Sequence, residues 1–225
     1  RAVARNIESS YNLLPSQKYF NSVSDPVITF DENSSFTEEW RNRWGNSIDS
    51  YSEFEEFLTG TGVSRNRPNA TSLKDPEVLR SDILNSSNEF HNSYDDFVFP
   101  SNIRVVEVAG WGLPTVKSLY YKKEHGSANY KVSITREGDG TVVYPSANLL
   151  QSPENYYFDL STFNSEETTP DYKHRDLLNS SPIQELIKNI FFNQIVDETD
   201  VLKKIKPEIL NIQDQLSVST HSPVI

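Results

Sequence analysis

The chain has 225 residues, 36% of them hydrophobic and 12% aromatic, which is enough apolar material for one sizeable domain or one with an appendage. Its net charge of −11 argues against a nucleic-acid partner, because phosphate binding needs clustered Lys and Arg. Cysteine is absent, which excludes disulfides, thiolate metal sites and cysteine nucleophiles. No apolar stretch approaches 18 residues, so the sequence predicts no membrane span, although brief contact with a lipid surface is compatible with it.

The first 30 residues combine a helical pattern with an extended one. Apolar side chains recur at helical spacing from Ala2 to Leu14, and the pattern ends at Pro15. Pro26–Phe30 is a short extended run that leads into a polar turn. We expect residues 1–30 to supply a helix and a strand of an α/β core.

Residues 31–100 are polar, rich in Asn and Ser, and broken by glycines and prolines. Two helices are predicted, Ser50–Leu58 and Asp75–Tyr94, the second with Asp75 as N-cap and Pro76 in the first turn. We interpret this segment as a helical cap or lid insertion. Its aromatic residues could meet lipid and shield an acyl chain, or pack as a helical subdomain: Trp40, Trp44, Tyr51, Phe54 and Phe57.

From residue 101 onward the pattern changes to short strands and a final helix. The expected strands are Ile103–Ala109, Val116–Tyr121, Tyr130–Thr135 and Tyr156–Leu160. An amphipathic helix follows over Pro182–Phe192, with Ser180 or Ser181 as its cap. The alternation predicts the α/β class, with the second part of the core over residues 101–195. We expect residues 196–225 to lead away from it as a linker and the start of a further β module.

Asp139 is the first candidate for chemistry. It stands between two glycines in Gly138-Asp-Gly140, directly after the predicted strand Tyr130–Thr135. Glycine tolerates positive φ, so the backbone can turn sharply and present the carboxylate at the edge of the sheet. The same residues are also typical of a plain hairpin turn.

His174 follows Asp139 by 35 residues and precedes the last predicted helix. Alone it would be an ordinary surface histidine. Together the two give the order, acid then histidine, in which the second half of an α/β-hydrolase supplies its triad. We therefore expect Asp139 to orient His174, and His174 to move protons. The remaining histidines are expected on the surface: His91, His125 and His221.

A nucleophile is missing from this pattern. The chain contains no Gly-x-Ser-x-Gly, and Ser146 is better interpreted as a helix cap. Gly110–Thr115 is rich in glycine but lacks the Lys of a phosphate loop, so we interpret it as a turn in which Trp111 has a packing role. No histidine pair or carboxylate–histidine cluster indicates a metal, and no cofactor is expected.

Four segments resemble the lecithin:cholesterol acyltransferase-like family of α/β-hydrolases, which includes phospholipid acyltransferases and bacterial lipases. They are Arg5–Ser16, Val108–Thr115, Gly138–Val142 with Ser146, and His174–Leu178. Their order is similar to the C-terminal half of that family, over Arg1–Phe192. The resemblance implies the C-terminal part of an α/β-hydrolase sheet with Asp139 as triad acid and His174 as triad base. It also implies that the serine and the oxyanion donors precede Arg1.

The implied function is a serine-dependent acyl ester hydrolase or O-acyltransferase acting on lipid acyl esters. Its partners would be a lipid or other acyl ester substrate and the N-terminal half of the same hydrolase, from the same chain or a cleaved one. An extracellular or cell-surface location is expected. Because the cysteines of the animal plasma enzymes are absent and Val143 replaces a frequent proline, the acyl acceptor stays open.

Two alternatives compete with the enzyme. One is a non-catalytic surface or adhesion module that keeps a hydrolase scaffold. The other is a glycan-binding or glycan-hydrolysing domain, which would need paired carboxylates facing one cleft.

Overall fold

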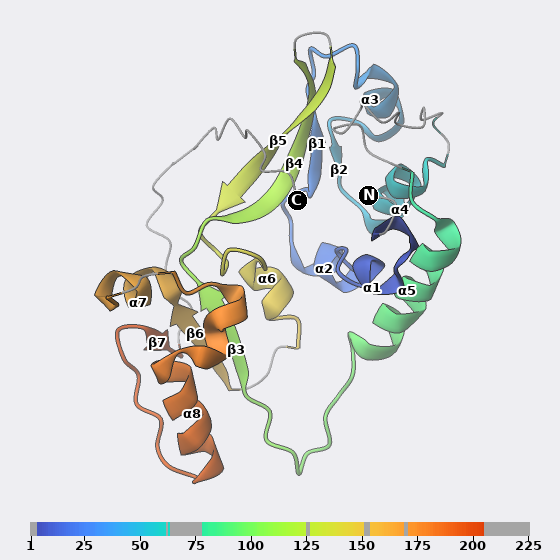
Figure 1. The fold of residues 1–225 in the computed structure, drawn as a ribbon. Coiled ribbons are helices and arrows are strands. Elements are labelled where there is room, and N and C mark those ends of the chain that lie inside the picture. The colour runs from blue at the N-terminus through green and yellow to red at the C-terminus, as the bar shows by residue number, and fades with distance from the viewer. Residues whose placement is uncertain are drawn as a thin grey trace. The chain divides into compact units, whose positions relative to one another are not determined.

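A computed structural model describes residues 4–61, 63, 78–124, 127–150, 154–168 and 171–204 of the protein. The chain divides into two compact units, and each contains helices and strands (Figure 1), so the α/β composition predicted from the sequence is confirmed. Unit 1 comprises Arg1–Phe97, Ser118–Ser133 and Leu216–Ile225, and unit 2 comprises Val98–Lys117 and Ile134–Gln215.

Unit 1 is organised around a mixed sheet of order β2-β1-β4-β5. The strands are β1 (Ile28–Phe30), β2 (Ser47–Ile48), β4 (Thr115–Glu124) and β5 (Ser127–Thr135). The short β1 pairs antiparallel with β2 and parallel with β4, while β4 and β5 form a long twisted ribbon (Figure 1). The first residues of β4 and the last of β5 belong to unit 2.

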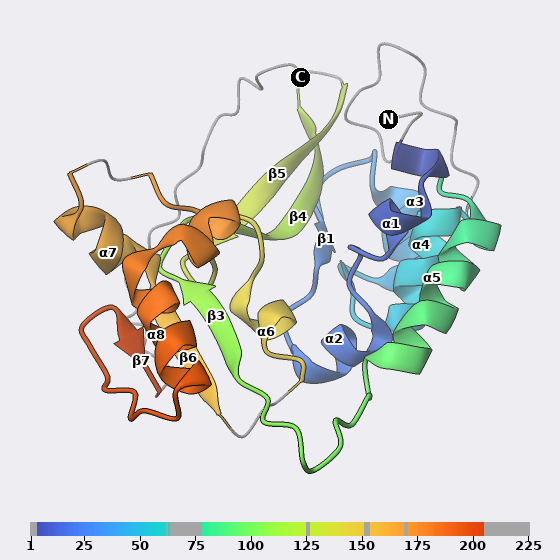
Figure 2. The ribbon, with the colours of Figure 1, turned by 60° about the horizontal axis from the view of Figure 1, so that its bottom comes forward.

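Short helices complete unit 1. They are the 3-10 helix η1 (Ala4–Asn6), α1 (Glu8–Tyr11), α2 (Gln17–Ser22), α3 (Glu38–Trp44), α4 (Tyr51–Thr59) and α5 (Ser81–Tyr94). A capping box between Ser50 and Glu53 starts α4, and Gly60 ends it in the left-handed conformation. Along its length α5 packs against α1 (Figure 2).

The aromatic residues of the predicted lid form the core of unit 1. The exposed fractions of Trp40, Trp44, Phe54 and Phe57 are between 1% and 7%. The rings of Trp40, Trp44 and Phe57 pack with the sheet residues Phe30 and Tyr121, with the centroids of Phe30 and Trp40 5.5 Å apart. The Phe54 ring packs instead on Phe20 and Tyr51. These four side chains therefore serve packing, the second of the two alternatives, and they are too buried to form a surface that meets lipid.

Unit 2 contains a three-stranded sheet of order β3-β6-β7. Its elements are β3 (Glu107–Trp111), α6 (Tyr144–Ala147), β6 (Asn155–Asp159), α7 (Leu160–Glu166), the 3-10 helix η2 (His174–Asn179), α8 (Ser181–Phe191) and β7 (Leu202–Lys203). Strands β3 and β6 are parallel, with Trp111 opposite Asp159. Their carboxyl ends thus lie side by side, the place where α/β sheets carry their sites.

The core of unit 2 joins this sheet to α7 and α8. Phe158 and Leu160 are fully buried and pack with Ile183 and Leu186 of α8, which lies across the sheet (Figure 2). Val201 and Leu202 belong to the same cluster, and β7 pairs antiparallel with β6. The expectation that the chain leads away after residue 196 is therefore wrong as far as residue 204. The further β module lies outside the described residues.

Two predicted helices are shorter than expected because tertiary contacts take their backbone groups. The pattern over residues 2–14 gives η1 and α1, separated at Ile7, and the Tyr11 hydroxyl donates to the Arg5 carbonyl. The helix predicted from Asp75 begins at Ser81. The N–H of Leu79 donates to Leu58 O and that of Arg80 to the Tyr11 hydroxyl, so neither is free for the helix. Asp75 and Pro76 themselves lie outside the described residues.

The other predicted elements are present with shifted ends. The strand expected over residues 103–109 runs from 107 to 111, because a turn at Pro100–Ile103 precedes it and Gly112, at φ +92°, ends it. Helices α2, α3, α6 and α7 were not predicted. None of the described helices is both long and apolar enough to cross a bilayer.

Candidate active site

The turn that carries Asp139, Gly138–Gly140 (the acid turn), lies against the segment that follows β3. After the turn at Gly112, the N–H of Leu113 donates to Gly138 O at 2.9 Å, and that of Gly112 donates to Arg136 O at 2.9 Å. Leu113 and Asp139 form an isolated parallel bridge. The sequence placed Asp139 at the end of the strand that precedes it, and the structure adds that this turn folds back beside the carboxyl end of β3.

Three glycines make room for this turn, each for a different reason. Gly140 has φ +90°, a conformation that favours glycine. Gly138 has an ordinary φ, but a Cβ there would lie 2.5 Å from Thr115 Oγ1. Gly110 of β3 faces the acid, and its Cβ would lie 2.6 Å from that of Asp139. Positive φ was expected on both sides of the acid, and only Gly140 uses it.

Asp139 is buried, with its side chain 4% exposed, and is hydrogen-bonded through both oxygens. Its Oδ1 accepts the N–H groups of Thr141 and Val142 at 3.1 and 2.8 Å. Its Oδ2 lies 2.7 Å from Nδ1 of His174. Because the N–H of Asp139 also donates to Val142 O, the segment is a tight turn as well. The same residues therefore form a tight turn and present an acid to the imidazole, so the two interpretations do not exclude each other.

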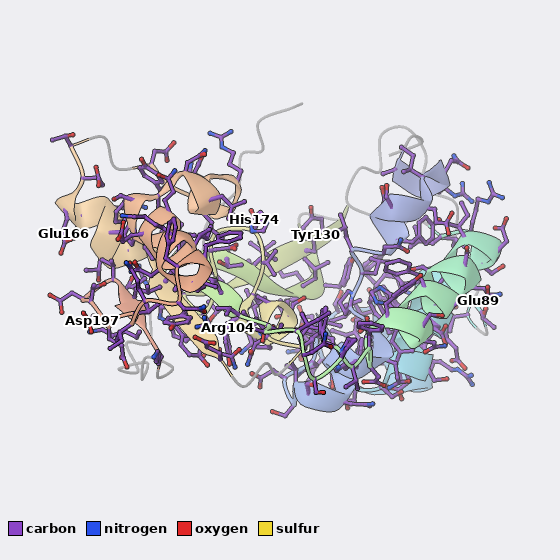
Figure 3. The ribbon with its side chains drawn as sticks, turned by 90° about the horizontal axis from the view of Figure 1, so that it is seen from below. Glu89, Arg104, Tyr130, Glu166, His174 and Asp197 are labelled. Carbon is purple, nitrogen blue, oxygen red and sulfur yellow. The ribbon has the colours of Figure 1, made fainter. Side chains whose placement is uncertain are left out.

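His174 opens η2, on the segment that follows β6 and α7 (Figure 3). Its N–H donates to the carbonyl of Asp139 at 3.1 Å, so backbone and side chain are both tied to the acid turn. The backbone that leads to His174 is held in place two residues earlier, at Tyr172. There the Asn164 amide exchanges two hydrogen bonds of 3.0 Å with the Tyr172 backbone, and the Tyr172 ring packs on Phe163.

The geometry decides which nitrogen of His174 is available. An ionised carboxylate only accepts hydrogen bonds, so the proton between Asp139 Oδ2 and His174 belongs to Nδ1. Nε2 is then left with a lone pair, and no hydrogen bond to it exists within the described ranges. The side chain is 47% exposed, so a reacting hydroxyl can reach this nitrogen. This is the arrangement of a general base held by a buried acid.

A second carboxylate stands at the end of β6 but is already engaged. Asp159 caps α7, where its Oδ1 accepts the N–H groups of Ser161 and Thr162 and its Oδ2 accepts the Thr162 hydroxyl at 2.8 Å. All of these bonds are local to one helix turn. Asp159 is therefore a structural cap, and Asp139 is the carboxylate that faces an imidazole.

The other predicted features near the site have packing roles. Trp111 is the last residue of β3, 6% exposed, and its ring packs on Tyr144. The Tyr144 and Tyr157 hydroxyls are 3.1 Å apart, and burial is the main cause that raises the pKa of Tyr144. Ser146 lies inside α6, whose N-cap is Val143, so the expectation that Ser146 caps a helix is wrong.

Of the remaining histidines, the described part of the chain includes His91, whose partner lies on its own helix. His91 belongs to unit 1 and pairs with Asp95 on the same helix, with Nδ1 and Oδ1 2.9 Å apart. Its side chain is 19% exposed, so it is more buried than the expected surface histidine. His125 and His221 lie outside the described residues.

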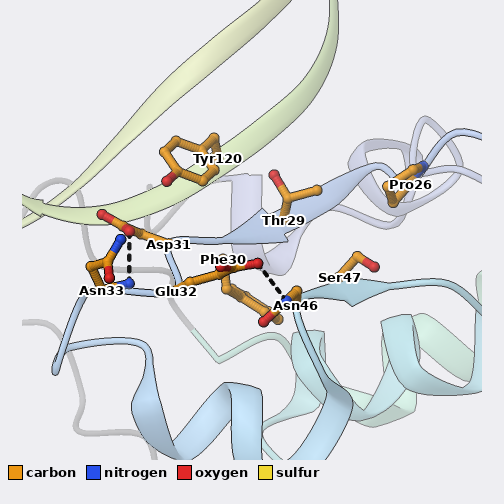
Figure 4. Close-up of a pocket in the computed structure, with 9 residues that line it drawn as sticks. All are labelled: Pro26, Thr29, Phe30, Asp31, Glu32, Asn33, Asn46, Ser47 and Tyr120. Carbon is orange, nitrogen blue, oxygen red and sulfur yellow. Dashed lines mark hydrogen bonds between the residues drawn. The ribbon is translucent and has the colours of Figure 1, made fainter.

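Unit 1 carries a separate polar pocket of about 390 Å³, lined by residues in and next to β1, β2 and β4 (Figure 4). Two carboxylates line it, but Asp31 accepts the Asn33 N–H at 3.0 Å and Glu32 accepts the Asn46 amide at 2.8 Å. Burial and the charge of Asp31 raise the pKa of Tyr120 in its wall. Because both carboxylates already have internal partners, the pocket does not offer the carboxylate pair of a glycosidase.

The described residues contain no group of three or more His, Cys, Asp or Glu side chains that could hold a metal ion. The Asp139–His174 pair is therefore the candidate site. In the comparisons with known proteins, no family model matches this chain, and no curated protein sequence matches it.

Proposed function

We propose that this chain supplies the acid and the histidine of a serine-dependent acyl ester hydrolase or O-acyltransferase acting on lipid acyl esters. The observation that carries the proposal is the 2.7 Å contact between Asp139 Oδ2 and His174 Nδ1 at the carboxyl ends of two parallel strands. The resemblance of four segments to the lecithin:cholesterol acyltransferase-like family supports the same chemistry. The nucleophilic serine would come from a region outside these 225 residues.

In the proposed reaction, His174 serves first as base and then as acid. Nε2 takes the proton of the serine hydroxyl while the serine oxygen attacks the ester carbonyl, and it then returns that proton to the alcohol that leaves. The product is an acyl-serine. Water or an acceptor alcohol next gives its proton to Nε2 and attacks the acyl carbon, and Nε2 returns that proton to the serine oxygen as the acyl–oxygen bond breaks. Asp139 holds Nδ1–H throughout and stabilises the imidazolium that forms twice.

Burial divides the roles between the two side chains. Asp139 is shielded, so water does not compete for its contact with the imidazole, and a charged partner stabilises the imidazolium more strongly than it would in bulk solvent. His174 is half exposed, as a group must be that receives a proton from one molecule and delivers it to another. The pair thus combines a fixed acid with an accessible base.

The test is hydrolysis of a lipid acyl ester by the full-length protein and its His174→Ala variant. We expect the variant's kcat/KM to fall by roughly 10³-fold or more, because the proton of the attacking hydroxyl has no acceptor. His91→Ala, which removes the histidine that pairs with Asp95 in unit 1, is the matched control and is expected to keep the activity. Equal rates for His174→Ala and the unaltered protein would remove His174 from the reaction and favour the non-catalytic module.

A further inference from the structure

We propose that Thr115 is a positioning residue that holds the acid turn in the register at which Asp139 meets His174. The inference rests on the proposed function, which makes this pair the catalytic one. The hydrogen bonds of the Thr115 hydroxyl go to Leu113 and Gly140 and to neither side chain of the pair. It acts through the backbone of the glycine that follows the acid.

The Thr115 hydroxyl bridges the two chain segments that meet at the turn. It donates to the carbonyl of Leu113 at 2.9 Å and accepts the N–H of Gly140 at 2.9 Å. The side chain is 1% exposed, so water does not replace these bonds. One hydroxyl therefore uses its donor and an acceptor lone pair to tie the exit from β3 to the residue after Asp139.

The turn is closely packed against Thr115 in addition to being hydrogen-bonded to it. A Cβ on Gly138 would lie 2.5 Å from Thr115 Oγ1 and 2.8 Å from its Cβ, so the turn rests directly on the threonine side chain. The Leu113 N–H donates to the carbonyl of Gly138 at 2.9 Å. Contacts with Thr115 thus restrain Gly138 and Gly140, the residues on either side of Asp139.

This arrangement explains how an acid on a turn can hold an imidazole precisely. Asp139 lies in the connection between β5 and α6, and His174 is the first residue of η2, so the two side chains do not share one regular element. A displacement of about 1 Å at such a contact can cost around 100-fold in rate. The bond from Gly140 to Thr115 holds the turn at the residue after Asp139, while Gly110, whose missing Cβ lies against Asp139, leaves room for the acid.

Thr37 offers a matched control in unit 1. It too is a fully buried threonine, and its hydroxyl donates to the carbonyl of Asp31 at 2.8 Å. Thr115→Val and Thr37→Val each replace a buried hydroxyl by a methyl group of similar size. Thr115→Ser keeps the hydroxyl and is the rescue variant.

The experiment uses the full-length protein labelled with ¹⁵N-histidine and records two properties of each variant. The first is the protonation of the two ring nitrogens of His174 by nitrogen chemical shift. The second is kcat and KM for a lipid acyl ester. In Thr115→Val we expect His174 to lose its fixed Nδ1–H tautomer and kcat to fall by about 10- to 100-fold with little change in KM. Thr115→Ser and Thr37→Val should keep the tautomer and the rate.

Different results overturn different parts of the proposal. If Thr115→Val keeps both the tautomer and kcat, Thr115 does not position the acid, while the catalytic pair stands. If the unaltered protein lacks the Nδ1–H tautomer, the pair itself fails, and the assignment of Thr115 fails with it. If Thr115→Val does not fold while Thr37→Val does, Thr115 is a structural residue and the positioning role is wrong.

Discussion

Within the described residues, each of the two units contains one histidine paired with an aspartate, and the two pairs are built differently. In unit 1, His91 and Asp95 lie four residues apart on α5, with Nδ1 and Oδ1 2.9 Å apart. In unit 2, Asp139 and His174 are 35 residues apart, and their contact is 2.7 Å. The distances are nearly equal. What separates the pairs is burial.

Both partners of the helical pair are 19% exposed, and Nε2 of His91 is buried with no hydrogen-bond partner. This nitrogen cannot exchange a proton with a substrate from solvent. In the other pair the acid side chain is 4% exposed and the histidine side chain 47%. Only the second arrangement combines a shielded acid with a reachable base, so a carboxylate–histidine distance alone is a poor sign of catalysis.

The largest expected effect comes from exchanging the acid of each pair for its amide. Asp139→Asn keeps the size of the side chain but can donate to Nδ1, which turns the imidazole into the wrong tautomer. We expect kcat for ester hydrolysis to fall by about 10⁴-fold. Asp95→Asn makes the same change in the helical pair and should leave kcat unchanged. A similar loss in both variants would mean that the comparison of the pairs is wrong.

The sequence predicted the two residues of this pair better than the framework that holds them. Gly138-Asp-Gly140 and His174 stand out because glycine next to a lone acid, and a histidine before a helix, are local patterns. Thr115 has no such signal, since it becomes important only when the turn folds onto it. The role of Gly110 is equally non-local, because only the structure shows that its missing Cβ faces Asp139.

Prediction of the fold has the same limit: local patterns are visible in the sequence, and long-range contacts are not. Strands and helices with strong periodicity, such as α8 and β6, lie within one residue of their predicted bounds. The aromatic run of α3 and α4 was ambiguous, because a buried aromatic core and a lipid-facing lid have the same composition. Tertiary partners settled it, since Phe30 and Tyr121 of the sheet cover those rings. Hydrophobic periodicity indicates which face of a helix or strand is buried, but it does not identify the partner that covers this face.

A core substitution in each unit tests whether the pairs depend on different cores. Phe158 is fully buried in unit 2 and contacts Phe163, which packs on Tyr172 two residues before His174. We expect Phe158→Ala to cost about 3–5 kcal/mol in the free energy of unfolding and to alter the ring signals of His174. Phe57→Ala, an equal deletion in unit 1, should cost a similar amount and leave His174 unaltered. Denaturant unfolding and histidine nitrogen shifts measure both, and a change at His174 in Phe57→Ala would contradict the separation.

A smaller loss of stability and activity is expected from a substitution at Gly110, where β3 contacts Asp139. Gly110→Ala places a Cβ 2.6 Å from that of Asp139, which is too close for either to stay in place. We expect a loss of about 1–3 kcal/mol in stability, the usual result of overpacking, together with a lower kcat. Gly45→Ala is the control, because a Cβ there meets nothing within 4 Å and only its φ of +78° is strained. Loss of kcat in Gly45→Ala as well would show that strain anywhere in the chain lowers activity.

The smallest expected effect concerns an ion pair in each unit. Hydrogen bonds from Arg104 lower the pKa of Glu154 in unit 2, and hydrogen bonds from Arg43 and then Trp44 lower that of Glu56 in unit 1. A glutamate whose pKa is lower in the folded protein stabilises the fold above its unfolded-state pKa, and that stabilisation is lost as the pH falls through the folded value. Glu154→Gln and Glu56→Gln should therefore each cost about 0.2–1 kcal/mol at neutral pH, and the difference from the unaltered protein should vanish in acid. Unfolding free energies at several pH values measure this. A cost that persists at low pH would assign the loss to packing or neutral hydrogen bonds, because the protonated carboxyl and the amide carry the same charge.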